Sequence, residues 1–439
     1  MVPRSALAPA LVALAALLGC SRGEEPARRA PAAAPGGPSA AATPTDLPAD
    51  LPNGLLVALS QFEVSPEGKV LPKPGPARLE ILTREGGAWV TRVVEDAESN
   101  VFHKAMVYTG VDGVPGILTL GGNAAAVKLW RKGPDGKLAP ETLWSTTFGG
   151  KQNRMRDAEV GDLGSGRPVD IAVATHDQGV VGLISPKPGG GFAVRELDRA
   201  PDTFVHEIEL GDLDGDGITE VYATPSEPNR LDGSPQAGKV VRYVPAKGEG
   251  RTLVADLGAR HAKEILVGDV DGDGRDELYV SVEAQTEGEG AQMRITAPVE
   301  IRRYDAGTDP KAGTLIATLD DRLTRFLTAG DVDGDGKKEM VAAAFRSGLW
   351  LLRPGADPKA PWHVESIDRQ SSGFEHAALL ADLDGDGVDE LYVASDDQGE
   401  IRRYVFHGGR FEREVIARRP VVGSAFVWNL MPVPVSLVR

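Results

Sequence analysis

The stretch Asp212-Leu-Asp-Gly-Asp-Gly-Ile-Thr-Glu220 decides the fold of this 439-residue chain, because the chain contains it in four versions. The other three begin at Asp269, Asp331 and Asp382, so that successive starts are 57, 62 and 51 residues apart. Recurrence at such a period is typical of propellers and solenoids. Each copy runs into a segment rich in β-branched and aromatic residues, such as Val221-Tyr-Ala-Thr224, which favours a strand. The motif therefore predicts a repeat unit and a loop that joins two strands.

The carboxylates in each copy stand so close together that they require a cation. Asp occupies loop positions 1, 3 and 5, and Glu occupies position 9. Such hard oxygen ligands suit Ca²⁺, which binds roughly six to eight of them, and the residue at position 7 can offer its carbonyl. We therefore expect about four Ca²⁺ ions per chain. The expected ligands are Asp212, Asp214, Asp216, Ile218 and Glu220; Asp269, Asp271, Asp273, Arg275 and Glu277; Asp331, Asp333, Asp335, Lys337 and Glu339; and Asp382, Asp384, Asp386, Val388 and Glu390.

An EF-hand is the alternative kind of calcium loop, and it needs a bidentate Glu at position 12 and a helix on each side. Strand-like segments follow the copies instead of helices, and no acid stands at position 12. The residues found there are Ala223, Val280, Ala342 and Val393. A metal-free polar turn is the other interpretation of a single copy, but four full copies argue against it.

Two weaker copies extend the series toward the N-terminus. The segment 162–170 keeps Asp162 and Asp170 at positions 1 and 9 but has glycines at positions 3 and 5. The segment 108–113 keeps little more than a turn around Asp112. We interpret both as repeats whose metal site has decayed, with binding by Asp162 and Asp170 as an open alternative.

The ends of the chain bear on the number of repeats. Each unit has four expected strands, which is the content of a propeller blade. Three strands are expected over 55–64, 77–83 and 88–94, and residues 424–431 match a strand that enters a loop. If this last strand pairs with the first three, the ring has seven blades, with six or eight as alternatives. The predicted fold is an all-β, seven-bladed β-propeller with calcium loops between the first and second strands of blades, closed by the N- and C-terminal strands.

The four nonapeptides resemble the repeats of the FG-GAP/VCBS family, whose relatives include the propeller of integrin α-subunits. The resemblance covers roughly residues 54–439, and it implies that the Asp-rich loop links the first two strands of a blade and binds calcium. The Phe-Gly and Gly-Ala-Pro signatures of the integrin-type repeat are not evident, so the chain is closer to the bacterial VCBS-like branch. Some relatives are polysaccharide lyases, which keeps a carbohydrate-active enzyme as an alternative function.

The N-terminal segment predicts export and a lipid anchor. The apolar run over 6–18 leads into Leu17-Leu-Gly-Cys20, which is similar to a bacterial lipoprotein signal, with an ordinary signal peptide as the alternative. Cys20 is the only cysteine, so no disulfide forms within the chain, and the following Ser21 favours the outer membrane. The expected domains are a signal peptide (1–19), the lipidated Cys20 with a disordered Ala/Pro/Gly-rich tether (20–53), and the propeller (54–439).

Charge and motifs restrict the function. The chain has 48 basic and 64 acidic residues, and its formal charge of −16 matches the sixteen carboxylates of the four loops. A basic surface for nucleic acid is therefore not expected. The sequence has no Gly-x-Ser-x-Gly elbow and no phosphate-binding loop, so we assign no catalytic residue. We expect a monomeric, non-catalytic envelope scaffold that binds a glycan or a protein, with a polysaccharide lyase-like enzyme or a structural envelope component as alternatives.

A basic or imidazole side chain stands six residues before most of the loops, near the start of the expected innermost strand. Such residues could ring the mouth of the central channel, on the face opposite the loops, and attract an acidic glycan or a phosphate. The alternative is that each pairs with an acid of a neighbouring blade, such as Asp157, Glu207 or Glu264. The candidate ligand-binding residues are His103, Arg156, His206, Lys263, Arg325 and His376.

Overall fold

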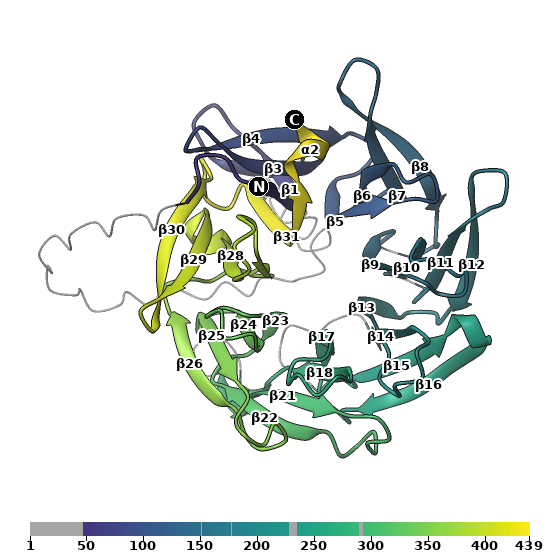
Figure 1. The fold of residues 1–439 in the computed structure, drawn as a ribbon, viewed down its shortest axis with the longest axis vertical. Helices are drawn as coiled ribbons and strands as arrows, with labels where there is room; N and C mark the ends of the chain where they lie inside the picture. Colours follow the sequence, from purple (N-terminus) through teal and green to yellow (C-terminus); the bar gives the residue numbers. More distant parts are fainter. Residues whose placement is uncertain (1–46, 151, 177, 228–234, 289–292) are drawn as a thin grey trace, which may run out of the picture.

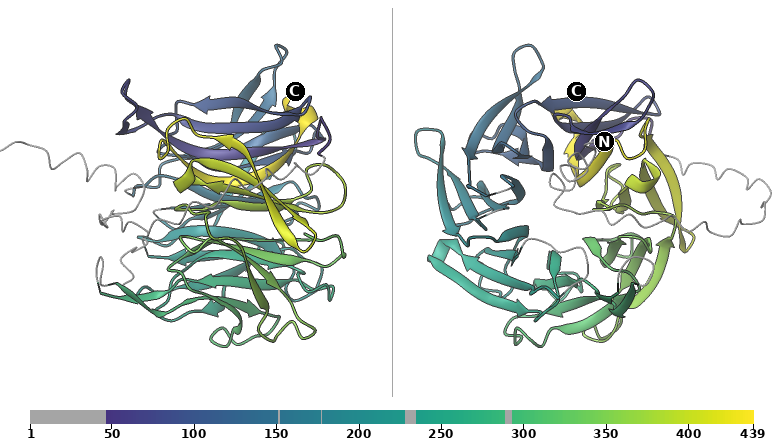
Figure 2. Two further views of the ribbon diagram at one scale, coloured as in Figure 1. Left: turned by 90° about the vertical axis from the view of Figure 1, so that its left-hand side faces the viewer. Right: turned by 180° about the vertical axis from the view of Figure 1, so that it is seen from behind.

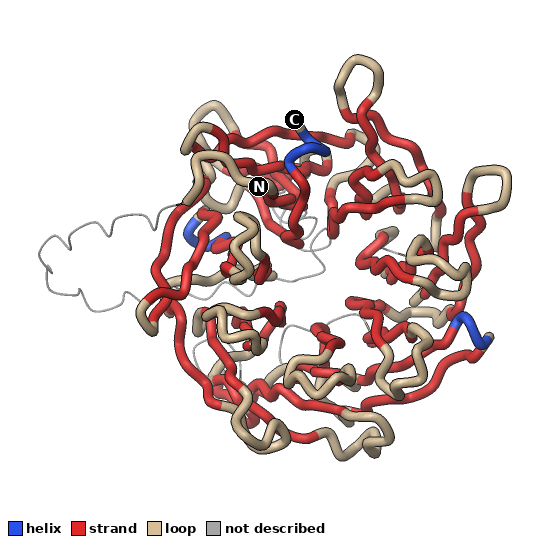
Figure 3. The backbone as a smooth tube through the Cα atoms, viewed as in Figure 1, coloured by secondary structure: helices blue, strands red, loops and turns tan. Residues whose placement is uncertain are grey.

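The computed structural model of the chain describes residues 47–150, 152–176, 178–227, 235–288 and 293–439. Its sheets are arranged in a ring around a central axis (Figure 1), and the view from behind in Figure 2 shows the same ring. Figure 3 shows that nearly all of its regular structure is strand. A ring of radial antiparallel sheets is a β-propeller, and the all-β prediction is confirmed. The predicted signal peptide, Cys20 and most of the tether lie outside the described residues.

Most sheets follow one plan, in which four strands pair in chain order as an antiparallel meander with the first strand nearest the axis (Figure 1). Five separate four-stranded sheets have this order. They are β9 (Met155–Gly161), β10 (Asp170–Thr175), β11 (Val181–Pro186) and β12 (Phe192–Asp198); β13 (Phe204–Gly211), β14 (Glu220–Ser226), β15 (Lys239–Val244) and β16 (Glu249–Asp256); β17 (Ala262–Gly268), β18 (Glu277–Val282), β21 (Val299–Tyr304) and β22 (Thr314–Leu319); β23 (Thr324–Gly330), β24 (Glu339–Ala344), β25 (Leu349–Arg353) and β26 (His363–Asp368); and β27 (Ala378–Ala381), β28 (Glu390–Ser395), β29 (Glu400–His407) and β30 (Arg410–Arg418).

The other ring strands form one nine-stranded sheet, which joins the two ends of the chain. Its members are β1 (Asn53–Val64), β2 (Val70–Pro74), β3 (Ala77–Glu85), β4 (Ala88–Asp96), β5 (Val101–Thr109), β6 (Pro115–Gly122), β7 (Ala125–Lys132), β8 (Leu138–Thr146) and β31 (Ala425–Pro434). Strand β1 pairs with β3 on one edge and with β31 on the other, while a single pair, Ser60 with Val101, connects it to β5. The predicted pairing of the C-terminal strand with the three N-terminal strands is therefore confirmed.

The core lies between neighbouring sheets. Every residue of β10, β14, β18, β24 and β28, the second strand of each separate sheet, is buried. Each of these strands lies inside a sheet that packs against other sheets on both faces, which explains why its middle residues are mostly apolar and do not alternate with exposed polar residues. Leu51, which we assigned to the tether, is also buried and packs with Leu55 of β1, so the packed region begins before residue 54.

A few elements were not predicted. The long connection between β18 and β21 contains a hairpin of β19 (Gln285–Glu287) and β20 (Arg294–Ala297). Its short polar strands have no apolar periodicity, so the sequence gives no strand signal. Strand β2 and the terminal helix α2 (Val435–Val438) were also missed. The described residues contain no helix with the length and apolar character needed to cross a membrane.

Candidate metal centres and the central channel

The four acidic motifs form loops (212–220, 269–277, 331–339 and 382–390, here the acidic loops) between the first and second strands of their sheets. In each loop, ligand oxygens of at least three carboxylates lie within 4.8 Å of one another. Two oxygens that are each about 2.4 Å from one Ca²⁺ ion can be at most about 4.8 Å apart, so these sets fit calcium. The sets are Asp212, Asp214 and Asp216; Asp269, Asp271, Asp273 and Glu277; Asp331, Asp333 and Glu339; and Asp382, Asp384 and Asp386.

The carboxylate of the first Asp in each acidic loop accepts hydrogen bonds from backbone N–H groups of the same loop. In the second loop, the two carboxylate oxygens of Asp269 accept the backbone N–H of Gly272 at 2.7 Å and of Gly274 at 3.0 Å. Both glycines have positive φ, 77° and 87°, which L side chains rarely adopt. Both bonds recur in the third and fourth loops. In the first loop the Asp212 carboxylate accepts the N–H of Gly217 and that of Asp216. The glycines at positions 4 and 6 are therefore required by the turn.

The Glu at position 9 is buried beneath its loop. Glu277 accepts the O–H of Tyr279 at 3.0 Å, and burial raises the pKa of its carboxyl to about 7. Glu277 and Glu339 lie close enough to their Asp partners to share an ion, whereas Glu220 and Glu390 fall outside the close sets. The oxygens of Glu220 instead accept bonds from Leu213, Tyr222 and Arg242. The structure thus places all four glutamates at their loops but brings only two into the ligand sets.

An arginine from the third strand of each sheet also reaches the loop, and we did not predict it. Arg303 contacts both Asp271 and Glu277, the latter at 3.1 Å, and its side chain is only 1% exposed. Its counterparts are Arg242, Arg353 and Arg403. The sequence signal was present, because these arginines stand near the end of the strand that recurs after each loop, as in Glu300-Ile-Arg-Arg-Tyr304.

Neighbouring acidic loops are also bonded to one another. Asp276, at position 8 of the second loop, accepts the backbone N–H of Asp212 at 2.8 Å. In the same way, Asp389 accepts the N–H of Asp331 at 3.0 Å. Lys338 donates to the backbone carbonyl of Asp269 at 3.0 Å. The residue at position 8 therefore couples each of these loops to the loop before it.

The weaker copy over 162–170 keeps the turn but has a different backbone. Asp162 accepts the N–H of Gly164 at 3.1 Å and of Gly166 at 2.9 Å, and Asp170 accepts that of Leu163. The positive φ values fall at Gly164 and Gly166, which are positions 3 and 5, where the acidic loops carry Asp. Among the described residues, Asp162 and Asp170 belong to no close set of metal-binding groups.

The candidate ligand-binding residues are all buried near the starts of the innermost strands. Five of them, His103, Arg156, His206, Lys263 and Arg325, fall where the register between the first and second strands shifts. A β-bulge leaves such a residue without a partner on the next strand and changes the direction of its side chain. The bulges explain how these side chains leave the regular alternation of their strands.

Pairing with acids is present, although the acids differ from those we named. Arg156 lies 3.4 Å from Glu375, which also binds Lys263. Arg325 lies 3.5 Å from Glu283. The named Asp157 instead pairs with Lys104 at 2.8 Å. Glu375 directly precedes His376 in the chain, and its position beside cations from two other sheets could not be predicted from the sequence.

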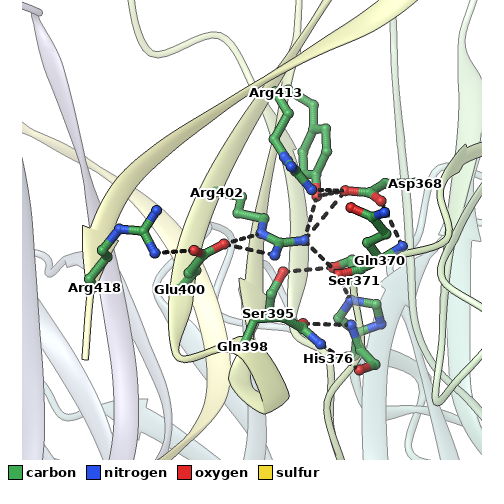
Figure 4. A network of polar contacts seen from close by, with 12 residues as sticks. Asp368, Gln370, Ser371, His376, Ser395, Gln398, Glu400, Arg402, Arg413 and Arg418 are labelled. Atoms are coloured by element: carbon green, nitrogen blue, oxygen red, sulfur yellow. Dashed lines mark hydrogen bonds and ion pairs between the residues drawn. The ribbon is translucent and has the colours of Figure 1, made fainter. Parts of the chain in front are cut away.

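The structure separates His376 from the other candidates. Its Nδ1 lies 2.6 Å from the carbonyl oxygen of Ala344, and its Nε2 lies 2.7 Å from the hydroxyl of Ser371. That hydroxyl is also hydrogen-bonded to the hydroxyl of Ser395 (Figure 4). Burial lowers the pKa of His376 to about 4. With both ring nitrogens bonded, His376 holds together the loop before β27. In the same network Arg402 binds Glu400.

Comparison with known proteins supports the β-propeller fold. No family model matches the chain. Integrin alpha pat-2 of Caenorhabditis elegans is 23% identical over 239 residues, which are 48% of this chain and 19% of the integrin. Rhamnogalacturonan exolyase YesX of Bacillus subtilis is 26% identical over 322 residues, 61% of this chain and 50% of the exolyase. The chain thus spans at most half the length of these relatives.

Among solved structures, a protein of Bacteroides uniformis, provisionally assigned as a 6-phosphogluconolactonase, superposes with a TM-score of 0.51 at 13% identity. The superposition covers 88% of this chain and 100% of that protein. A similar protein of Bacteroides fragilis also has a TM-score of 0.51 at 13% identity, with 87% of this chain covered. At this level of identity the similarity concerns the fold alone.

Proposed function

We propose that this chain is a calcium-binding β-propeller of the FG-GAP/VCBS type, with seven blades and four Ca²⁺ ions in the acidic loops. The observation that carries the proposal is the closeness of the carboxylate oxygens, which lie within 4.8 Å of one another in all four loops. Bound Ca²⁺ would offset the repulsion among these acids and stabilise one face of the ring. The five separate sheets and the two halves of the nine-stranded sheet support the count of seven blades.

In this proposal the calcium ions are structural, and the propeller is an exported scaffold that binds a glycan or a protein. The lipoprotein-like signal ending at Cys20 supports an anchor in the cell envelope, with Ser21 favouring the outer membrane. The acidic loops occupy one face of the ring, so the ligand would bind toward the other face. The buried cations at that end of the channel support an anionic ligand.

A calcium titration of the full chain tests the proposal. We expect isothermal titration calorimetry to show about four ions per chain, and chelation to lower the melting temperature more than a change of ionic strength does. Asp214→Asn, Asp271→Asn, Asp333→Asn and Asp384→Asn should each remove one ion. Asp135→Asn is the matched control, because Asp135 is an exposed acid in a turn outside the acidic loops. An unchanged melt on chelation, or four ions still bound by the loop variants, would refute the calcium assignment.

A carbohydrate-active enzyme is the second candidate, and the similarity to the exolyase over 322 residues favours it. A lyase that cleaves an acidic polysaccharide needs a cation beside the uronate carboxylate and a base near the proton that is removed. Arg156 and Lys263 could supply the cation. Incubation of the full chain with rhamnogalacturonan or polygalacturonate, followed by ultraviolet absorbance of the unsaturated product, tests this candidate. Product formation that is abolished by Lys263→Met would support it, and binding without product would support the scaffold.

A further inference from the structure

Four of the seven histidines meet at the end of the channel that lies away from the acidic loops. Their ring centroids are 6.1 Å apart between His103 and His176, 5.1 Å between His176 and His206, and 5.6 Å between His206 and His261. Of these four residues, here the histidine arc, His103 lies in β5 and His206 in β13, while His176 directly follows β10 and His261 directly precedes β17. His176 and His261 were not among the predicted candidates, because they do not share the six-residue spacing.

The nitrogens of the histidine arc are buried without partners. Neither ring nitrogen of His176, His206 or His261 has a hydrogen-bond partner within the described part of the chain, and neither does Nε2 of His103. All four side chains are at most 5% exposed. A buried polar group without a partner costs about 1–3 kcal/mol, so seven such nitrogens in one place indicate that a ligand completes the site.

Cations outnumber acids around the histidine arc. Arg156 and Lys263 share the single carboxylate of Glu375, and Arg325 pairs with Glu283. Burial, together with these cations, holds the pKa of His176 well below its ordinary value, so the imidazole is neutral. The charged pairs comprise three cations and two carboxylates, so the formal charge of the layer is positive. The neutral imidazoles of His176, His206 and His261 can each donate one hydrogen bond to a ligand, whereas the N–H of His103 is used by the carbonyl of Met155 at 2.9 Å.

The acids on the loop side of this layer do not cancel its charge. Asp157 is already paired with Lys104. Burial raises the pKa of Glu264 to about 8, and it raises those of Glu207 and Glu209 well above the ordinary carboxyl value. The Glu264 carboxyl therefore holds its proton at neutral pH, and burial disfavours the charged form of Glu207 and Glu209 in the same way. An anion at the histidine arc would thus face acids whose charged form is disfavoured by burial.

A small pocket lies next to the histidine arc, on the other side of Trp428. It has a volume of about 20 Å³ and is lined in part by Asn100, Arg154 and Trp428. The Trp428 ring lies 4.8 Å from that of His103, and the Arg156 guanidinium lies 5.4 Å from the centre of the same indole. Trp428 therefore separates the pocket from the buried site, and its fluorescence reports on both.

We propose that the histidine arc, with Arg156 and Lys263, is a binding site for a small oxyanion such as a carboxylate or a sulfate-like group. Imidazole N–H and guanidinium or ammonium groups are donors that such an anion accepts, and the net positive charge favours it in a site of low dielectric constant. A metal cation is disfavoured, because the cations repel it and the arc is not among the close sets of metal-binding groups. The inference rests on the binding role proposed for this end of the channel and is independent of calcium.

Calorimetry and Trp fluorescence of the full chain, with sulfate and D-glucuronate as separate probes and D-glucose as the uncharged control, test the site. We expect one bound oxyanion per chain. We also expect a change in the tryptophan fluorescence of the chain, to which Trp428 contributes. Sulfate binding alone would indicate an inorganic ligand, and preferred glucuronate binding would indicate a sugar acid.

His206→Phe should weaken binding at least about tenfold, which corresponds to about 1.4 kcal/mol. It should leave the melting temperature unchanged or raised, because an apolar ring replaces a polar ring that has no partner.

His363→Phe is the matched control, since His363 is exposed on the outer strand β26 and should leave binding unchanged. His261→Phe is a second variant for the case in which His206→Phe does not fold. The proposal would be overturned if neither oxyanion bound to the natural chain. It would also be overturned if His206→Phe and His261→Phe both bound the oxyanion as tightly as the natural chain does. Zinc binding that depends on His206, without oxyanion binding, would also overturn it. Calcium stoichiometry measured in the same samples separates failure of this site from failure of the calcium assignment.

Discussion

Arg303 is the residue on which the second acidic loop depends when calcium is absent. Its side chain contacts Asp271 and Glu277 and is almost completely buried. Removal of one partner from a buried ion pair leaves a buried charge uncompensated, which typically costs about 3 kcal/mol or more. We therefore expect Arg303→Met to lower the free energy of unfolding by about 3 kcal/mol in calcium-free buffer, as measured by urea denaturation. Saturating calcium should reduce the loss, because the ion supplies positive charge to the same carboxylates.

Arg294→Met provides the comparison for this prediction. Arg294 pairs with Glu287 on the exposed hairpin, where the two side chains are 74% and 61% exposed. Exposed ion pairs contribute at most about 1 kcal/mol, so this variant should be nearly neutral. Equal losses in the two variants would show that Arg303 has no special role at the loop.

Asp396 makes stability depend on pH. Burial raises the pKa of its carboxyl to about 7, and its Oδ2 accepts the backbone N–H of Val427 at 2.9 Å. The folded chain therefore holds this proton more tightly than the unfolded chain, so the stabilisation is complete at low pH and is lost as pH rises toward about 7. Each unit of raised pKa corresponds to about 1.4 kcal/mol. We expect Asp396→Asn, which keeps an oxygen for Val427, to flatten the decline in unfolding free energy between about pH 4 and pH 7. If the curves of unfolding free energy against pH were parallel for the natural chain and Asp396→Asn, the assignment of this pH dependence to Asp396 would be contradicted.

At the scale of elements, the repeat motif could be predicted almost completely because its information is local. The strand after each acidic loop, such as β18 after Glu277, is a continuous apolar segment with a β-rich composition. The glycine positions and the connection of first to second strand follow from the same nine residues. The bulges at His103 and His206 could not be predicted, since a register shift depends on how two strands pair and not on the composition of either. For the same reason the histidine arc, which joins several sheets, has no sequence signature.

The loop over 162–170 should not bind calcium. Its positive φ values lie at Gly164 and Gly166, and a Cβ on Gly164 would come within 3.2 Å of the Ala246 backbone. The positions that carry Asp in the acidic loops therefore cannot carry it here without strain. We expect Asp162→Asn to leave the calcium stoichiometry unchanged in calorimetry, whereas Asp214→Asn removes one ion. Loss of an ion in Asp162→Asn would show that Asp162 and Asp170 form a fifth site.

At the scale of the whole molecule, strand β31 closes the ring without a covalent link. It pairs with β1 from Asn53 to Gln61, and Leu430 packs in the same apolar cluster as Leu55. Each of the five four-stranded sheets comes from one continuous part of the chain, so among the described strands the β1–β31 pairing is the one that joins the two ends. Its stability therefore depends on contacts across the largest sequence separation in the ring.

Deletion of residues 425–439 should convert the closed ring into a self-associating chain. Strand β1 is highly apolar over Leu55–Leu59, and without β31 its backbone N–H and C=O groups along that edge lose their partners. An open apolar edge is a template for pairing with another chain. We expect light scattering after size-exclusion chromatography to show larger oligomers or aggregates than the full chain, which we expect to be a monomer, forms at the same concentration. Deletion of residues 285–297 removes a similar length in the separate β19–β20 hairpin and should leave the chain monomeric. A monomeric 425–439 deletion with an unchanged melting temperature would show that the ring does not need this strand for closure.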